Sequence, residues 1–191
     1  MAGFAGAGVG VAAFVFAGSD VGQNLGAFVQ DVFSPVKDLN VSLVVRVDRY
    51  RLLVDESAVS PRLGVAYHVH GSETVIRGSY SRLFMPPFSE NLLLSSSEAA
   101  SRLAPASVRQ ALGGAYRPLR PERQHTYEAG VQMPAGRALT LDVATYRKTS
   151  RDQQDNNNFF DTGIIFPTTL HGIEVRGAEA RLSLLPRHGW S

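Results

Sequence analysis

The chain has 191 residues, of which 44% are hydrophobic and 19% are charged, a balance that excludes wholesale disorder. Its 19 basic residues face 17 acidic ones, and the small excess is spread along the sequence. This argues against nucleic acid as a partner, because phosphate binding needs clustered cations. The chain holds no cysteine, so disulfides, thiolate metal sites and cysteine nucleophiles are excluded.

The first 23 residues form a glycine-rich segment that we separate from the rest of the chain. The uncharged stretch from Ala2 to Ser19 is barely long enough to cross a bilayer as a helix, and its glycines lower its helix propensity. As a signal peptide it lacks a basic start, although Val15-Phe16-Ala17 is an acceptable cleavage site. We expect either a strand and loop of the same sheet as the remainder or a degenerate signal, with disorder as a third reading.

From residue 24 onward, apolar and polar residues alternate with the period of two that a β-strand requires. The clearest stretch runs from Leu39 to Tyr50, where one face is uniformly apolar and the other includes a cation and an anion. Such a strand suits lipid on one side and water or protein on the other. The seven strands that the pattern predicts are 24–34, 39–50, 62–69, 74–81, 125–133, 139–148 and 172–185.

The connections between these strands are predicted to differ in length at the two ends of the sheet. Short breaks fall at 34–38, 70–73 and 134–137, a moderate loop at 49–60, and long loops from Phe84 to Glu122 and from Thr149 to Leu170. Short turns at one end and long loops at the other are expected of outer-membrane barrels. We therefore expect the two long loops to contact an extracellular ligand.

The predicted fold class is all-β, an antiparallel up-and-down transmembrane β-barrel segment that occupies residues 24–191. Predicted strands of about nine to twelve residues match a tilted membrane crossing, whereas soluble strands centre on about five or six. Seven is an odd number for a bacterial barrel. Either residues 8–16 supply an eighth strand, or the sheet is open with exposed edges.

Charged residues recur on the face of these strands that we expect to point away from lipid, into the lumen. They can contact a plug or guide an anionic ligand, or they can pair with one another and keep the wall polar. We favour the paired wall. The predicted lumen-facing residues are Arg46, Arg62, Arg77, Glu128, Asp142, Glu179 and Arg181.

No cofactor or metal is predicted from the residues. His68 and His70 share one strand at a spacing of two, but the sequence specifies no nearby carboxylate or third ligand, so we interpret them as structural. The acidic stretch with Asp152, Asp155 and Asp161 lacks the positions of an EF-hand and is interpreted as a solvated loop. No nucleophile elbow or other signature of catalysis is present, which favours a protein that is not an enzyme.

Aromatic residues lie near the predicted strand ends, where they are candidates for the girdle that flanks the apolar band of a membrane barrel. Some of them face inward in the predicted register and would serve in packing. These aromatics are Tyr50, Tyr67, Tyr80, Phe84, Tyr127 and Tyr146.

Several short segments, in this order and spacing, make the chain resemble the C-terminal barrel portion of TonB-dependent outer-membrane receptors. Each segment alone is weak, but together they cover residues 24–185. They are Gln30-Asp31 with Pro35, residues 43–50, residues 60–67, residues 77–84 with Pro86-Pro87, Pro121-Glu122, residues 127–130, Leu141-Asp142 with Tyr146, and Gly177-Ala178-Glu179.

The resemblance implies a location in the cell outer membrane, a plug domain inside the barrel, and a TonB-type energy-coupling partner. It implies uptake of a ligand such as a siderophore or another nutrient. Neither a plug nor a TonB box is recognisable here, so the chain is expected to be a barrel fragment. The alternatives are a soluble all-β binding or adhesive module, whose apolar faces pack on a second sheet, and a passive porin-like channel.

Overall fold

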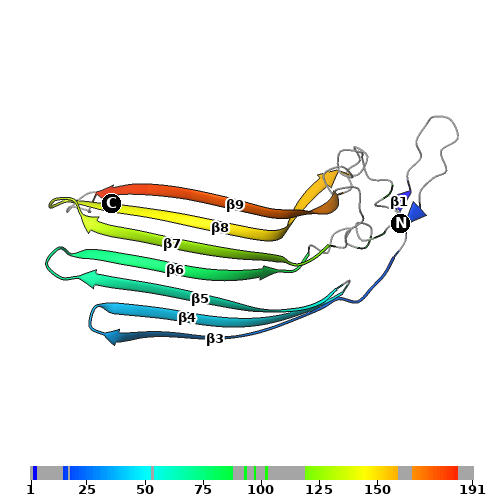
Figure 1. Ribbon diagram of the computed structural model, residues 1–191, viewed down its shortest axis with the longest axis horizontal. Helices are drawn as coiled ribbons and strands as arrows, with labels where there is room; N and C mark the ends of the chain where they lie inside the picture. The colour runs from blue at the N-terminus through cyan, green and yellow to red at the C-terminus, as the bar shows by residue number, and fades with distance from the viewer. Residues whose placement is uncertain are drawn as a thin grey trace, which may run out of the picture.

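The protein is described by a computed structural model at residues 2–3, 15–16, 18–52, 54–87, 93, 97, 102, 119–158 and 165–184. Seven strands lie side by side in one antiparallel sheet, in the order of the sequence (Figure 1). The all-β prediction and the seven expected strands are therefore confirmed. The strands are β3 (Gln23–Val36), β4 (Leu39–Arg51), β5 (Asp55–Val69), β6 (Thr74–Met85), β7 (Glu122–Pro134), β8 (Leu139–Asn158) and β9 (Ile165–Leu184).

The sheet is open in the part of the chain that the structure describes, with β3 and β9 at its two edges. Near the N-terminus, β1 (Ala2–Gly3) and β2 (Val15–Phe16) pair in a separate two-stranded sheet. The proposed eighth strand at 8–16 is therefore wrong for Val15 and Phe16, and its other residues lie outside those described. The division of the chain after residue 23 stays a prediction.

Three tight turns gather at one end of the sheet, at the left of Figure 1. They connect β3 to β4, β5 to β6 and β7 to β8 at residues 37–38, 70–73 and 135–138. Each contains a residue in the left-handed backbone region, which glycine and, less readily, Asp or Asn adopt. The residues are Asp38, Gly71, Glu73 and Gly136, with φ values of 72°, 85°, 52° and 86°.

Two of the predicted loops are shorter than expected. The moderate loop at 49–60 is a connection of residues 52–54, because β4 runs to Arg51 and β5 begins at Asp55. The loop predicted from Thr149 to Leu170 is largely strand, since β8 continues to Asn158 and β9 begins at Ile165. Main-chain hydrogen bonds hold these extensions together, and such bonds do not depend on the polar side chains that suggested a loop.

The residue pairing divides the side chains of the sheet between two faces. Directly paired residues point to the same side, and successive residues alternate. We call the first side the apolar face; on β4 it carries Val41, Leu43, Val45 and Val47, which pair with Val65, Leu63, Pro61 and Val59 of β5. We call the second side the charged face, and it begins on the same strand with Ser42, Val44 and Arg46.

Neither face is covered by a second layer among the described residues, and the buried cluster is small. Tyr50, Ala58 and Phe84 pack together near the connection between β4 and β5. By contrast, Leu43, Val47 and Ile76 are 41%, 49% and 48% exposed. No described helix has the length and hydropathy that crossing a membrane as a helix would take. The sheet therefore presents a wide apolar surface against which none of the described residues pack.

Candidate functional site

All seven residues that the sequence analysis assigned to the lumen lie on the charged face. The pairing places Arg62 opposite Val44, and Arg77 opposite Ala66. It continues through Glu128 opposite Ser79 and Asp142 opposite Gln132. On β9, Arg181 pairs with Asp142 and Glu179 with Ala144. The register thus brings together, on one side of the sheet, residues that are up to 135 positions apart, from Arg46 to Arg181.

Arg77 is the centre of an ion-pair network on this face. Its Nη2 donates to Oδ1 of Asp142 at 2.8 Å, and its Nε lies 3.9 Å from Oε1 of Glu128. The side chains of Arg77 and Asp142 are 30% and 29% exposed. The cation and the carboxylates therefore compensate one another at a partly buried position, as the paired-wall reading expects.

Glycines give these side chains room to lie flat on the sheet. A Cβ added at Gly130 would come 2.8 Å from Cζ of Arg77, and one at Gly177 would come 2.4 Å from Cζ of Tyr146. Nearer the edge strand, Gly26 lies under the pair of Arg46 and Asp48, whose Nη2 and Oδ1 atoms are 2.7 Å apart. Because these glycines have no side chain, the neighbouring side chains lie close to the main chain on the charged face.

The charged face holds a depression with a volume of about 320 Å³. Small side chains form its floor, among them Ser42, Gly64, Ala66 and Ser79. Arg77 and Glu128 stand on one side of it, and Val32 and Asn40 on the other. The lining is mostly apolar, with Arg77 and Glu128 beside it, so the depression can accommodate the apolar part of a protein loop or ligand next to a charged group.

The apolar face forms a continuous belt that stops at charged residues toward the end of the sheet with the longer connections. On β4 the apolar positions run from Leu39 to Val47 and are followed by Arg49 and Arg51. These nine residues match the length of a tilted membrane-crossing strand, about 9–11 residues. Asp31 of the edge strand β3 departs from the pattern, since it lies on this face opposite Leu43.

Ion pairs connect the charged residues at this margin of the belt. Oδ2 of Asp55 accepts hydrogen bonds from Nη2 of Arg49 at 3.0 Å and from Nη2 of Arg51 at 3.1 Å. Across the sheet, Arg147 of β8 lies 3.0 Å from Glu174 of β9, which also pairs with Arg176. The hydrogen bond from Arg49 is the largest of the effects that lower the pKa of Asp55, and Arg51 adds to it. Ionised groups of this kind are expected in water or lipid headgroups.

The aromatic residues divide between the two faces, as the sequence analysis expected. Tyr67, Tyr80 and Tyr127 lie on the apolar face, where Tyr80 and Tyr127 are cross-strand partners with ring centroids 5.0 Å apart. Tyr80 also shares a hydrogen bond of 3.0 Å with Nδ1 of His125. Tyr50 and Tyr146 point to the charged face.

The predicted ligand-binding loops are described only in part. Of the stretch from Phe84 to Glu122, the structure describes 84–87, 93, 97, 102 and 119–122. Near its ends, Glu122 accepts a hydrogen bond of 2.5 Å from the Ser150 hydroxyl, and Arg123 pairs with Glu56. In the second stretch, Asp152 and Asp155 lie on β8 in place of the solvated loop that we expected, and Asp161 lies outside the described residues.

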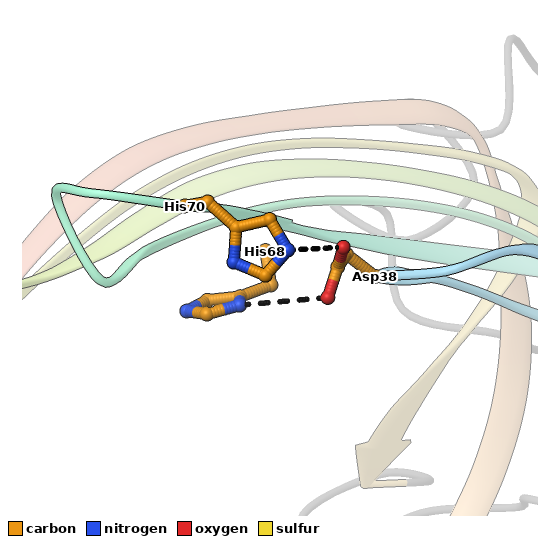
Figure 2. Close-up of side chains that lie close together, drawn as sticks. All are labelled: Asp38, His68 and His70. Carbon is orange, nitrogen blue, oxygen red and sulfur yellow. Dashed lines mark ion pairs between the residues drawn. The ribbon is translucent and has the colours of Figure 1, made fainter.

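Sequence reasoning missed Asp38, which lies beside the two histidines (Figure 2). Its Oδ2 is 2.6 Å from Nε2 of His70, and its Oδ1 is 3.8 Å from Nδ1 of His68. The sequence alone specified no carboxylate beside His68 and His70, and the structure places that of Asp38 there. The contact follows from the register: Leu39 pairs with Tyr67, and one further step along both strands places Asp38 opposite His68.

A comparison with protein families decides the identity of this two-faced sheet. The sequence profile of the family described as TonB dependent receptor-like, beta-barrel matches residues 3–191. The chain belongs to this receptor family. The resemblance noted from the sequence is confirmed, and the family places this receptor barrel chain in the outer membrane.

Solved structures share the fold of this receptor barrel chain. The copper transporter OprC superposes with a TM-score of 0.64 at 14% identity, over 88% of this chain and 27% of OprC. The FrpB iron transporter of Neisseria meningitidis gives a TM-score of 0.59 at 15% identity, over 87% and 24%. The ferripyoverdine receptor of the Pseudomonas aeruginosa outer membrane gives 0.57 at 22% identity, over 90% and 22%.

The receptor barrel chain spans about a quarter of the length of these structures. No curated protein sequence matches it. Membership of a receptor family, in place of an enzyme family, agrees with the absence of a catalytic signature from the sequence. It also argues against the soluble adhesive module, whose apolar faces would pack on a second sheet.

Proposed function

We propose that this chain forms part of the wall of a receptor for TonB-dependent uptake of a ligand such as a siderophore or another nutrient. The apolar face contacts lipid, and the charged face lines the lumen. The observation that carries this proposal is the separation of an apolar and a charged face over the six strands from β4 to β9, in a chain of the receptor family. The action is binding and gated passage, with no covalent chemistry.

The charged face has the properties that the lumen of such a receptor needs. Arg46, Arg62, Arg77 and Arg181 supply cations, and Glu128, Asp142 and Glu179 supply carboxylates, so the wall can pair internally or exchange partners with a plug domain. The depression beside Arg77 and Glu128 offers a place for a plug loop. Residues 84–122 and 149–170 would take part in capture of the extracellular small molecule, because their described parts lie toward the end of the sheet with the longer connections.

The partners in this proposal are outer-membrane lipid, a plug domain and a TonB-type energy-coupling protein. Two of the structures that share this fold are an iron transporter, FrpB, and a copper transporter, OprC. This supports a metal complex or a similar nutrient as the ligand class. A passive porin-like channel is the competing function, and only energy dependence separates the two.

A chimera tests the proposal with a known ligand. This chain would replace the matching segment of the ferripyoverdine receptor, and uptake of radiolabelled ferripyoverdine would be measured in cells with and without functional TonB. The expected result is uptake that needs TonB and falls when residues 88–118 are deleted. The matched control shortens the turn at 135–138, which lies at the opposite end and should leave ligand capture intact.

Two results would overturn the proposal. The chimera could fail to reach the outer membrane under conditions where the parent receptor does, which would contradict the role as a wall. Alternatively, uptake could proceed equally without TonB, which would assign the chain to a passive channel.

A further inference from the structure

Asp38, His68 and His70 form a cluster at the end of the sheet with the tight turns. Asp38 lies in the turn between β3 and β4, His68 on β5, and His70 in the turn between β5 and β6. The cluster therefore joins two neighbouring hairpins, and Figure 2 shows both imidazoles turned toward the one carboxylate. One ligand atom from each residue lies within 4.8 Å of the other two.

The main chain fixes the relative position of two of these residues. The amide N–H of His68 donates to the carbonyl oxygen of Asp38 at 2.8 Å. This bond adds one step to the ladder between β4 and β5, so it keeps the Asp38 side chain next to the ring of His68. Asp38 adopts a φ of 72°, a conformation that Asp and Asn tolerate better than most residues.

The two ring nitrogens of His68 have separate surroundings. Nδ1 faces Asp38 at 3.8 Å, whereas Nε2 lies 3.0 Å from Oε2 of Glu73. A histidine that binds a metal commonly donates its other ring N–H to a carboxylate, which fixes the tautomer and the ring orientation. Glu73 is placed to accept a hydrogen bond from the Nε2–H group of His68. In that tautomer the lone pair of Nδ1 is free to bind a metal on the side of Asp38.

We propose that Asp38, His68 and His70 bind one divalent transition-metal ion of the zinc class and thereby clamp the β3–β4 turn to the β5–β6 turn. Two imidazole nitrogens and one carboxylate oxygen suit Zn²⁺, whereas Ca²⁺ and Mg²⁺ prefer oxygen ligands alone. Three protein ligands leave one tetrahedral position for water or another ligand.

The cluster needs only a local adjustment to reach metal geometry. Bonds of about 2.0–2.2 Å to a tetrahedral zinc ion bring ligand atoms to about 3.3 Å from one another. Without an ion, Oδ2 of Asp38 lies 2.6 Å from Nε2 of His70, and Oδ1 of Asp38 lies 3.8 Å from Nδ1 of His68. The His70 side chain is 59% exposed and that of His68 is 33% exposed, so the rings have space to rotate around an ion.

Binding of Zn²⁺ to the full chain, prepared without a polyhistidine tag and refolded in detergent micelles, tests this proposal. Competition with a chromophoric zinc chelator should show one tightly bound equivalent. His68→Ala, His70→Ala and Asp38→Asn should each abolish that equivalent, and Glu73→Gln should weaken it by about 10- to 100-fold, as loss of a supporting carboxylate does elsewhere. Asp38→Asn suits the turn because asparagine tolerates the same backbone conformation.

The control is His125→Ala, which removes the imidazole that bonds to Tyr80 and is not part of the cluster. This variant should bind Zn²⁺ like the unchanged chain. Far-UV circular dichroism of each variant confirms that the sheet is formed. In addition, Zn²⁺ should raise the urea midpoint of the unchanged chain and of His125→Ala, but not that of Asp38→Asn, because a ligand that binds only the folded state stabilises it.

The proposal is overturned if the folded chain binds no stoichiometric Zn²⁺, which would leave Asp38 as an ion-pair partner of the histidines only. It is equally overturned if His68→Ala and Asp38→Asn bind Zn²⁺ as well as His125→Ala does. Neither result bears on uptake by the receptor, so failure of this site and failure of the proposed function can be told apart. The proposed function enters only in placing the end of the sheet with the tight turns, and therefore the cluster, on the periplasmic side, where outer-membrane barrels have their short turns.

Discussion

The guanidinium of Arg77 on β6 reaches over β7 to the carboxylate of Asp142 on β8, with Nη2 2.8 Å from Oδ1. The two residues lie on strands that are not neighbours in the sheet, and Gly130 of β7 leaves the space between them open. The contact joins three strands on the charged face. The strength of this contact therefore tests whether the charged residues of that face stabilise the sheet by pairing with one another.

The first prediction is that Arg77 and Asp142 stabilise the folded sheet together. A double-mutant cycle with Arg77→Met and Asp142→Asn, followed by urea unfolding in lipid vesicles, should give a coupling free energy of about 0.2–1 kcal/mol, because both side chains are partly exposed. A coupling indistinguishable from zero would mean that the pair adds nothing to the stability of the wall.

The second prediction concerns the space above β7. Gly130→Ala should lower the free energy of unfolding, because the added methyl group would displace the Arg77 guanidinium from its position beside Asp142. The control is Gly78→Ala on the opposite face, where the new Cβ would lie 3.6 Å from Val65, an ordinary contact. In a strand, Gly78→Ala is expected to be neutral or slightly stabilising. Equal effects of the two substitutions in urea unfolding would contradict the steric argument.

The third prediction is a pH dependence at the margin of the apolar belt. Asp55 has a pKa below its ordinary value of 3.8, chiefly because Arg49 donates a hydrogen bond to its carboxylate. Its contribution to stability is therefore complete above about pH 3.8 and is lost as the pH falls through the lower pKa of the folded state. Carboxyl carbon NMR of the chain in micelles should show Asp55 titrating below 3.8 in the unchanged chain and closer to it in Arg49→Gln. A midpoint at or above 3.8 in the unchanged chain would refute the pairing.

The fourth prediction separates the two faces of one strand. Val45→Arg should reduce insertion into vesicles at a cost of about 2–4 kcal/mol, because the cation would lie in the middle of the belt. Val44→Arg, one residue away on the charged face, should have little effect. If Val45→Arg inserts as well as Val44→Arg, the assignment of the apolar face to lipid is wrong.

Much of the fold could be predicted from the sequence because the pattern and the turns agree. From Leu39 to Val47 every second residue is apolar, with Val44 as the one apolar residue between them. The tight turns contain residues that tolerate a left-handed backbone, such as Gly71 and Gly136. The same alternation assigned all seven charged residues to one face. The alternation of side chains is a local property of each strand, so the face of a residue can be predicted without knowing which strands pair.

Other features depend on pairing and were missed for that reason. The extension of β8 to Asn158 follows from its ladder with β9, where Gln153 pairs with Leu170, although its polar residues favour a loop. The cluster of Asp38 with His68 and His70 requires the register of β4 against β5, which no single stretch of sequence contains. The prediction of an eighth strand was wrong at Val15 and Phe16, because these residues pair with β1 and not with the seven-stranded sheet.

The central claim, that the apolar face contacts lipid while the charged face does not, has a direct test because the chain holds no cysteine. Single cysteines at positions 43, 44, 45, 46 and 47 of β4 would be labelled with an environment-sensitive fluorophore and quenched by spin-labelled lipid in vesicles. Strong quenching at 43, 45 and 47 with weak quenching at 44 and 46 is the predicted result. Quenching that is uniform or absent along the strand would contradict the account.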